Sequence, residues 1–251
     1  MSNVSHRRRL RRSDCSDPGL RRIRRGRGLA YVDEDGRGIE DPQLVGRIRD
    51  LSIPPAWTDV WICRDPWGHL QATGSDAAGR KQYLYHELWR GRRDREKFER
   101  MLRFARALPR LRRRVGSDLR GSDPSRSRVL ACAARLLELG LFRIGGEEYA
   151  ENGGGLGLAT LQRTHVEFEN GSIVFDYPAK GGVRRVCAID DRACAALLQA
   201  LKRRRGGGPE LLAYRDGRRW VDVRSDEVND YLKQHAGEEF SAKDFRTWNA
   251  T

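Results

Sequence analysis

Three basic residues stand in short motifs whose chemistry suits a phosphate group. Arg143 lies in LFRIG (141–145), Lys180 in YPAKGG (177–182) and Arg246 in KDFRTW (243–248). Two arginines can bind the non-bridging oxygens of a phosphodiester while negative charge builds up on them. A lysine whose pKa is lowered by burial can donate the proton that a departing 5′ oxygen needs. Taken singly, each residue is better explained as a surface cation.

The composition of the chain supports a chemical role for the lysines in motifs of this kind. The chain has six lysines against forty-three arginines, and Lys81, Lys180 and Lys243 all lie in such motifs. Arginine is permanently charged, whereas lysine can release a proton, so the two are not interchangeable in catalysis. A GC-rich genome that favours arginine codons is the simpler alternative, and composition alone does not separate the two explanations.

Metal-assisted chemistry has no clear support in the sequence. There is no H-E-x-x-H motif, and the five cysteines form neither a C-x-x-C pair nor a His/Cys cluster at zinc spacing. We therefore expect no metal and no cofactor, and the sequence argues against two-metal phosphodiester chemistry. The scattered cysteines predict reduced thiols in a cytoplasmic protein, and no segment is apolar for long enough to cross a membrane.

Positive charge is concentrated in two blocks of the chain. The net charge is +14 and the isoelectric point about 10.2. Residues 1–28 carry ten arginines against two aspartates, and residues 90–115 carry eleven arginines and one lysine against three acidic residues. The remainder is slightly acidic. Dense basic blocks of this kind predict binding to a polyanion, and nucleic acid is the usual one.

The N-terminal part divides into an arm and a small domain. Residues 1–28 have almost no large apolar side chains, which predicts a disordered basic arm that can be deleted without unfolding the protein. Residues 29–90 alternate short apolar stretches with turns rich in Gly, Pro and Asp, including strands at 61–63 and 70–73. This pattern predicts a β-rich domain.

Residues 91–251 predict a second, mostly α-helical domain. Apolar residues from Phe98 to Leu108 recur at helical spacing, and Pro109 is expected to end that helix, with a basic loop up to Ser125. A second helix covers 129–137 and ends at Gly140. Later helices are expected after Asp190 or Asp191, from Ser225 to Gly237, and after the capping box that begins at Ser241. The last would stop at Thr251 before it buries anything, which we interpret as a truncation.

A three-stranded sheet interrupts these helices and presents Lys180. Residues 165–169 and 172–176 alternate in polarity around Asn170-Gly171, a strong β-hairpin signal. A third strand at 183–188 follows the 178–182 turn. Lys180 is therefore expected at the tip of a glycine-containing turn between two strands.

Four motifs in this order resemble the type IB DNA topoisomerases, in the poxvirus-like bacterial branch. They are GRKQYLYH (79–86), the block from Leu141 to Asn152, the Lys180 hairpin and KDFRTW (243–248). The resemblance implies that Arg143 and Arg246 stabilise the transition state at the phosphate, that Lys180 is the general acid, and that Lys243 assists nearby. It also implies a C-shaped clamp around duplex DNA, with a β-rich N-terminal domain and a mostly α catalytic domain that act as a monomer, associated with the nucleoid.

By the same resemblance, residues 80–85 contact DNA. Gln82 would reach a base edge, whereas the tyrosines would reach the backbone or bases; the predicted contacts are Arg80, Lys81, Gln82, Tyr83 and Tyr85. Strand alternation places Tyr83 and Tyr85 on one face, so either both reach DNA or both are buried.

The chain departs from the family pattern in two places. The loop at 153–161 is richer in glycine and poorer in hydroxyl groups than expected, which predicts fewer phosphate contacts there. The family's nucleophile is a tyrosine downstream of the KDFR motif, and no tyrosine follows Arg246; Tyr231 precedes it on a different helix and is rejected as a substitute.

Two alternative functions remain. One is a tyrosine recombinase, although recombinases carry His-x-x-Arg where this chain has Lys243-x-x-Arg246. The other is a non-catalytic DNA-binding remnant of the enzyme.

Overall fold

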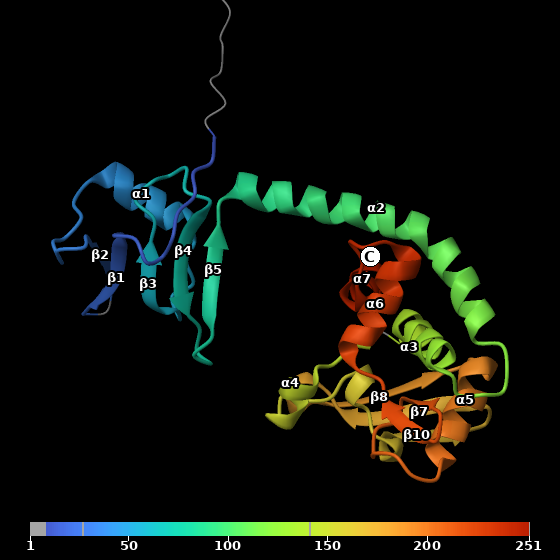
Figure 1. The fold of residues 1–251 in the computed structure, drawn as a ribbon. Coiled ribbons are helices and arrows are strands. Elements are labelled where there is room, and N and C mark those ends of the chain that lie inside the picture. The colour runs from blue at the N-terminus through green and yellow to red at the C-terminus, as the bar shows by residue number, and fades with distance from the viewer. Residues whose placement is uncertain (1–8, 27, 141, 251) are drawn as a thin grey trace, which may run out of the picture. The chain divides into compact units, whose positions relative to one another are not determined.

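The computed structural model describes residues 9–26, 28–140 and 142–250, which form two compact units (Figure 1). The first unit reaches to Phe98 and the second begins at Glu99. The helix α2 (Glu87–Asp118) starts in the first unit and ends in the second. The fold is α+β, with a β-rich N-terminal unit and a helical second unit, as the sequence predicts.

The first unit is a five-stranded antiparallel sheet with one helix packed against it. The strand order is β2-β1-β3-β4-β5. Buried side chains from three of the strands and from the helix form its core, as expected for a sheet with one buried face; these are Leu20, Ile48, Val60, Ile62 and Ala72. The elements are β1 (Leu20–Arg25), β2 (Gly28–Val32), α1 (Pro42–Asp50), β3 (Thr58–Ile62), β4 (Leu70–Ser75) and β5 (Lys81–Tyr85).

The prediction of a disordered arm over 1–28 is wrong for residues 20–25. These residues form β1, which pairs with β2 on one side and β3 on the other. Leu20 is buried in the core, and the Arg22 guanidinium donates hydrogen bonds to the carbonyls of Ile53, Pro54 and Trp57. Arginine is compatible with a strand when its charged end reaches carbonyl groups or solvent. Residues 1–8 lie outside the described part of the chain.

The second unit is built around α3 (Arg126–Gly140), most of whose residues are buried. A three-stranded antiparallel sheet in the order β6-β7-β8 joins the same hydrophobic core, as predicted for the segment around Asn170. The remaining elements are α4 (Glu147–Glu151), β6 (Val166–Glu169), β7 (Ser172–Pro178), β8 (Arg184–Ile189), α5 (Arg192–Arg203), β9 (Ala213–Asp216), β10 (Arg219–Asp222), α6 (Ser225–Ala236) and α7 (Ala242–Asn249).

The helix α2 continues through Pro109, so the predicted stop at this residue is wrong. A proline inside a helix removes one backbone hydrogen bond and bends the axis, and Figure 1 shows α2 curving along its C-terminal half. Packing compensates for that loss, because one side of the helix is buried at spacings of three and four residues. The buried residues are Met101, Phe104, Leu108, Leu111 and Val115, whereas Phe98 and Leu102 of the predicted stripe are exposed.

The hairpin turn between β6 and β7 forms as its sequence predicts. Asn170 and Gly171 have φ angles of 49° and 88°, the left-handed conformations that a two-residue type I′ turn requires. Glu169 pairs with Ser172 on either side of the turn.

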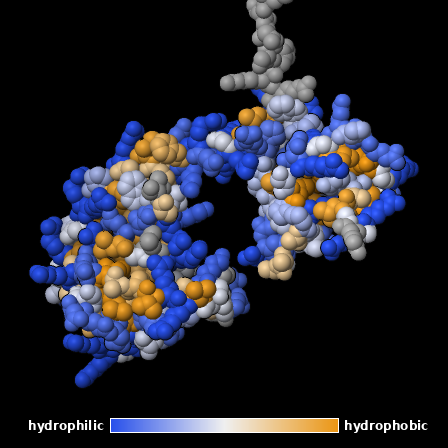
Figure 2. Space-filling model, turned by 180° about the vertical axis from the view of Figure 1, so that it is seen from behind, coloured by the Kyte–Doolittle hydropathy of each residue, from blue (hydrophilic) through white to orange (hydrophobic). Residues whose placement is uncertain are grey.

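Hydrophilic residues cover most of the visible face of each unit, with apolar residues in separate patches (Figure 2). This surface agrees with the net charge of +14. In the described ranges no helix is both long and apolar enough to span a membrane.

Candidate functional site

Arg143 is presented by a backbone segment that is fixed on both sides. The preceding residue, Phe142, is fully buried and packs edge-on against Phe175, with ring centroids 4.9 Å apart. The carbonyl of Arg143 accepts a hydrogen bond of 2.8 Å from the Leu158 amide. The Arg143 side chain itself is exposed. A buried phenylalanine therefore anchors an arginine that faces solvent.

Arg246 is presented in the same way, from α7. The preceding Phe245 is 1% exposed and packs edge-on against Phe104, with centroids 5.1 Å apart. The start of α7 is held by the predicted capping box, in which the Ser241 amide donates to Asp244 Oδ2 at 2.9 Å. The position of Arg246 thus depends on both a buried ring and a helix cap.

A partly buried ion pair ties this helix start to α2. Arg100 donates from Nε and Nη2 to the two oxygens of Asp244, at 2.6 and 2.8 Å. Burial would raise the pKa of the Asp244 carboxyl, but the hydrogen bonds from Arg100 and Ser241 outweigh it and hold the pKa below its ordinary value. Asp244 is therefore an ionised anchor for α7.

Arg246 lies within electrostatic reach of two other arginines. Burial lowers the pKa of Arg246, and the positive charges of Arg143 and Arg185 lower it further. The same three guanidinium groups act on Tyr177, whose pKa is raised chiefly by burial and is pulled back by Arg185, Arg246 and Arg143. Like charges gathered in this way repel one another, so an anion placed among them is favoured.

Arg185 was missed in the sequence, although the structure places it in this cluster. It lies on β8, on the face that includes the buried Ile189, and its guanidinium stands 5.6 Å from the centre of the Phe142 ring. Its Nη2 donates a 2.6 Å hydrogen bond to the carbonyl of Gly140, at the end of α3. The strand alternation of 184–189 was the available signal, because it puts Arg185 on the core-facing side.

Lys180 lies at the turn between β7 and β8, as predicted. The turn is a short 3₁₀ helix (Lys180–Gly182) in which Gly181 and Gly182 have φ angles of 79° and 73°. It is closed by a 2.8 Å hydrogen bond from the Ala179 amide to the Val183 carbonyl. The Lys180 side chain is exposed.

The glycine-rich loop connects the Lys180 turn to the Arg143 segment through its backbone. A Cβ atom on Gly155 would overlap the carbonyl of Ala179, and one on Gly157 would overlap Gly145 and approach the carbonyl oxygen of Arg143. The Leu156 amide donates to the Pro178 carbonyl at 2.8 Å. The glycines that depart from the family pattern therefore allow close backbone approach between the two segments.

Lys243 lies in the first turn of α7, three residues before Arg246. Residues three apart on a helix are neighbours on its surface, and Lys243 is exposed. The structure thus places Lys243 on the same helix as Arg246, about one turn before it.

The predicted DNA-contacting strand is β5, at the edge of the five-stranded sheet. Tyr83 and Tyr85 lie on one face, with their rings stacked at 6.2 Å, and Tyr83 is 49% exposed. Lys81 lies on the same face, with its Nζ 5.8 Å from the centre of the Tyr83 ring and 3.2 Å from Cys15 Sγ. Leu84, on the other face, packs against the core. Tyr83 is exposed and Tyr85 is half-buried, so neither ring belongs to the buried core, and contact of the two with DNA stays a prediction.

Gln82 and Arg80 are arranged differently from the tyrosines. Gln82 alternates to the face of Leu84, and its Nε2 donates to Asp76 Oδ2 at 2.9 Å. Arg80 pairs with the same carboxylate at 2.8 Å. Hydrogen bonds from Arg80 lower the pKa of Asp76 to about 2. The five predicted contacts therefore do not form a single face of the strand.

Tyr231 is held in a structural role. It lies on α6, is 5% exposed, and its hydroxyl donates to Asp118 at 2.8 Å. Its pKa is raised, first by burial and then by Asp118. Its burial agrees with rejecting it as a nucleophile.

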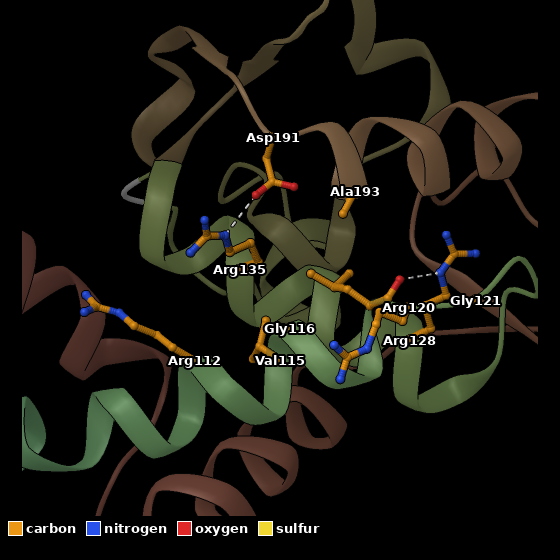
Figure 3. A pocket seen from close by; sticks show the side chains of 10 residues that line it. Arg112, Val115, Gly116, Arg120, Gly121, Arg128, Arg135, Asp191 and Ala193 are labelled. Carbon is orange, nitrogen blue, oxygen red and sulfur yellow. Dashed lines mark hydrogen bonds and ion pairs between the residues drawn. The ribbon is translucent and has the colours of Figure 1, made fainter.

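A separate pocket of the second unit, of about 530 Å³, is lined by arginines but by none of the predicted site residues (Figure 3). Three of these arginines have partners within the protein: Arg135 pairs with Asp191 at 2.9 Å, Arg112 with Glu138 at 2.6 Å, and Arg128 donates to the carbonyl of Leu119 at 3.1 Å. No group of three or more His, Cys, Asp or Glu suited to a metal ion occurs among the described residues.

Comparison with known proteins identifies the family of the chain. Residues 86–251 match the model of the eukaryotic DNA topoisomerase I catalytic core, and residues 28–76 match that of the bacterial DNA topoisomerase IB N-terminal domain. The chain is 31% identical over 237 residues to DNA topoisomerase 1B of Acanthamoeba polyphaga mimivirus, covering 92% of this chain and 70% of the viral protein. It is 24% identical over 171 residues to DNA topoisomerase 1B of vaccinia virus, covering 62% and 54% respectively. The chain belongs to the type IB DNA topoisomerase family.

Proposed function

We propose that the chain binds duplex DNA as a monomer and carries the phosphate-activating residues of a type IB topoisomerase. Arg143 and Arg246 would bind the non-bridging oxygens of the scissile phosphate. Lys180 would protonate the leaving 5′ oxygen, with Lys243 assisting nearby. The observation that supports the proposal is that two arginines from separate segments act on the same groups: the charge of Arg143 lowers the pKa of Arg246, and both arginines lower that of Tyr177 against the effect of its burial.

The reaction we propose is relaxation of supercoiled DNA through a transient 3′-phosphotyrosyl link. No tyrosine follows Arg246 in the sequence. Tyr177 is near the arginines, but it is 2% exposed, its ring stacks on Phe142, and burial raises its pKa, so it is a poor nucleophile. We therefore expect residues 1–251 to bind DNA without cleaving it.

Duplex binding can be tested by its salt dependence. Several phosphate contacts release counterions, so affinity should fall about tenfold or more between low and physiological salt, with little sequence preference. Fluorescence anisotropy with two labelled duplexes of unrelated sequence measures both properties. Salt-independent binding, or a stronger affinity for anionic lipid vesicles than for duplex, contradicts the proposal.

Cleavage can be tested by trapping protein on supercoiled plasmid with denaturant. For residues 1–251 we expect neither relaxation nor a covalent adduct, with or without magnesium, because arginines that stabilise a transition state cannot replace a nucleophile. Extending the chain through the tyrosine helix of the family should restore both. An adduct mapped to any of the seven tyrosines of this sequence would show that the nucleophile has been misassigned.

A further inference from the structure

A row of aromatic rings in the first unit extends beyond the DNA-contacting strand. Tyr83 stacks on Tyr85, the Tyr85 ring lies 6.2 Å from His69, and His69 meets Trp89 edge-on at 4.9 Å. The row therefore runs from the exposed edge of the sheet to the first turn of α2. Its far end is used neither by the core of the unit nor by the phosphate chemistry of the second unit.

The end of this row opens into a cavity of about 560 Å³. Sites for small organic ligands span about 300–1,000 Å³, so the cavity has room for a nucleotide. All of its lining belongs to the first unit, and consists of His69, Tyr85, Trp89, Arg90, Arg93 and Asp94. Three aromatic rings and two exposed arginines thus share one hollow with a single carboxylate.

The ring of His69 is held in place by a hydrogen bond at its inner nitrogen. The Ser13 amide donates to His69 Nδ1 at 3.1 Å. A neutral imidazole that accepts at Nδ1 carries its proton on Nε2, so the ring keeps one donor for a further partner. The residues that line the cavity therefore include aromatic rings, one of which carries a ring N–H donor.

We propose that this cavity binds an unpaired nucleobase of DNA. The base would stack against Trp89 and Tyr85, and Arg90 and Arg93 would contact the flanking phosphates. Aromatic side chains beside basic ones are the usual platform for single-stranded nucleic acid, because every base has a π face. Bases inside a duplex are stacked on both sides, so only a base outside the stack can enter. The inference rests on the proposed function in that the chain must bind DNA.

The test compares two labelled strands of equal length and charge, one an oligothymidylate and one made of abasic nucleotides, on the protein of residues 1–251. Stacking is worth about 1–3 kcal/mol per base, so we expect the oligothymidylate to bind about fivefold to 150-fold more tightly. Trp89→Leu should abolish this preference and leave duplex affinity unchanged, whereas Trp89→Phe should preserve it. Equal affinities for the two strands in the wild type, or a preference that survives Trp89→Leu, overturn the proposal.

The chain provides a matched pair of charge variants. Arg92 and Arg93 are adjacent, exposed and both paired with Glu96, at 3.0 and 2.9 Å, but only Arg93 lines the cavity. Arg93→Gln should weaken oligothymidylate binding more than Arg92→Gln does, although each removes one positive charge. Equal losses contradict the assignment of Arg93.

Duplex affinity, measured in parallel, distinguishes failure of this proposal from failure of the proposed DNA-binding function. If neither duplex nor single strand binds, the proposed DNA-binding function fails as well. If duplex binds with normal salt dependence but the strands with and without bases bind alike, only the cavity assignment fails. Thermal unfolding followed by circular dichroism shows whether Trp89→Leu is folded, and if it is not, the comparison of Arg93→Gln with Arg92→Gln still tests the cavity.

Discussion

The two units of the molecule present the side chains of the proposed sites in different ways. In the second unit, Arg143 and Arg246 each follow a fully or almost fully buried phenylalanine. In the first unit, Lys81 and Tyr83 lie on an edge strand with exposed side chains. Groups that act on one phosphate must be placed within a fraction of an ångström, whereas groups that contact a DNA surface tolerate local adjustment.

Ion pairs show the same contrast. Asp244 is buried and is held by Arg100 and Ser241, so its charge fixes the start of a helix. Asp76 also accepts several hydrogen bonds, but its main partner Arg80 is largely exposed and the pair lies in a surface turn. Removing the Asp244 carboxylate should therefore disturb the position of Arg246, whereas removing the Asp76 carboxylate should not.

The largest effect is expected from deleting residues 1–28. This deletion removes β1, a strand inside the five-stranded sheet, together with the buried Leu20, so the first unit should unfold. Deleting only residues 1–8 should leave the unit folded and reduce DNA affinity slightly. Near-ultraviolet circular dichroism and limited proteolysis distinguish these results. A folded first unit after the longer deletion would show that β1 is dispensable.

The next effect is on cleavage, in a chain extended through the tyrosine helix of the family. Arg143→Ala or Arg246→Ala should each slow single-turnover cleavage by about 10²–10³-fold, because each removes a donor aimed at developing charge. Arg218→Ala, on the exposed β9–β10 turn, is the control and should have little effect. Comparable losses in all three variants would point to general electrostatic attraction and not to a built phosphate site.

A smaller effect on stability is expected from Asp244→Asn. Breaking this pair should lower the free energy of unfolding by about 2 kcal/mol, less than for a fully buried pair because Arg100 is partly exposed. Asp76→Asn in the first unit is the contrasting variant and should change stability much less. Urea unfolding of both variants measures the difference. Equal destabilisation would remove the contrast between the units.

The Asp244 contribution should also depend on pH. In the folded chain the pKa of its carboxyl lies below the ordinary 3.8, so folding stabilises the ionised form of this carboxyl. The resulting stability is present above pH 3.8 and is lost as the pH falls through the folded pKa. The difference between wild type and Asp244→Asn should therefore stay constant near neutral pH and shrink in strong acid. A difference that grows in acid has the wrong sign for this account.

Features set by neighbouring residues could be predicted from the sequence. The Asn170-Gly171 turn and the Ser241 capping box depend on a few adjacent residues, and both form as expected. The family motifs also singled out Arg143, Lys180 and Arg246 as candidates, which lie on three separate segments. Local chemistry and recognisable motifs were thus sufficient for the main outline.

Features set by distant packing could not be predicted. The strand β1 is stabilised by pairing with two other strands, which outweighs its high charge, and α2 passes Pro109 because its buried side packs on the second unit. Arg185 belongs to the arginine cluster only because β8 folds beside the end of α3. The roles of Gly155 and Gly157 likewise depend on backbone that approaches from elsewhere in the chain.

The central claim is that Lys180 donates the proton while the arginines stabilise charge on the phosphate. In the extended chain, the Lys180→Ala variant should cleave ordinary DNA much more slowly than the wild type does. It should cleave a 5′-bridging phosphorothiolate substrate at nearly the wild-type rate, because a thiolate leaves without protonation. Arg143→Ala and Arg246→Ala should show no such rescue, since the phosphate oxygens carry charge in both substrates. Equal slowing of Lys180→Ala on both substrates would contradict the claim and make Lys180 a phosphate-binding residue.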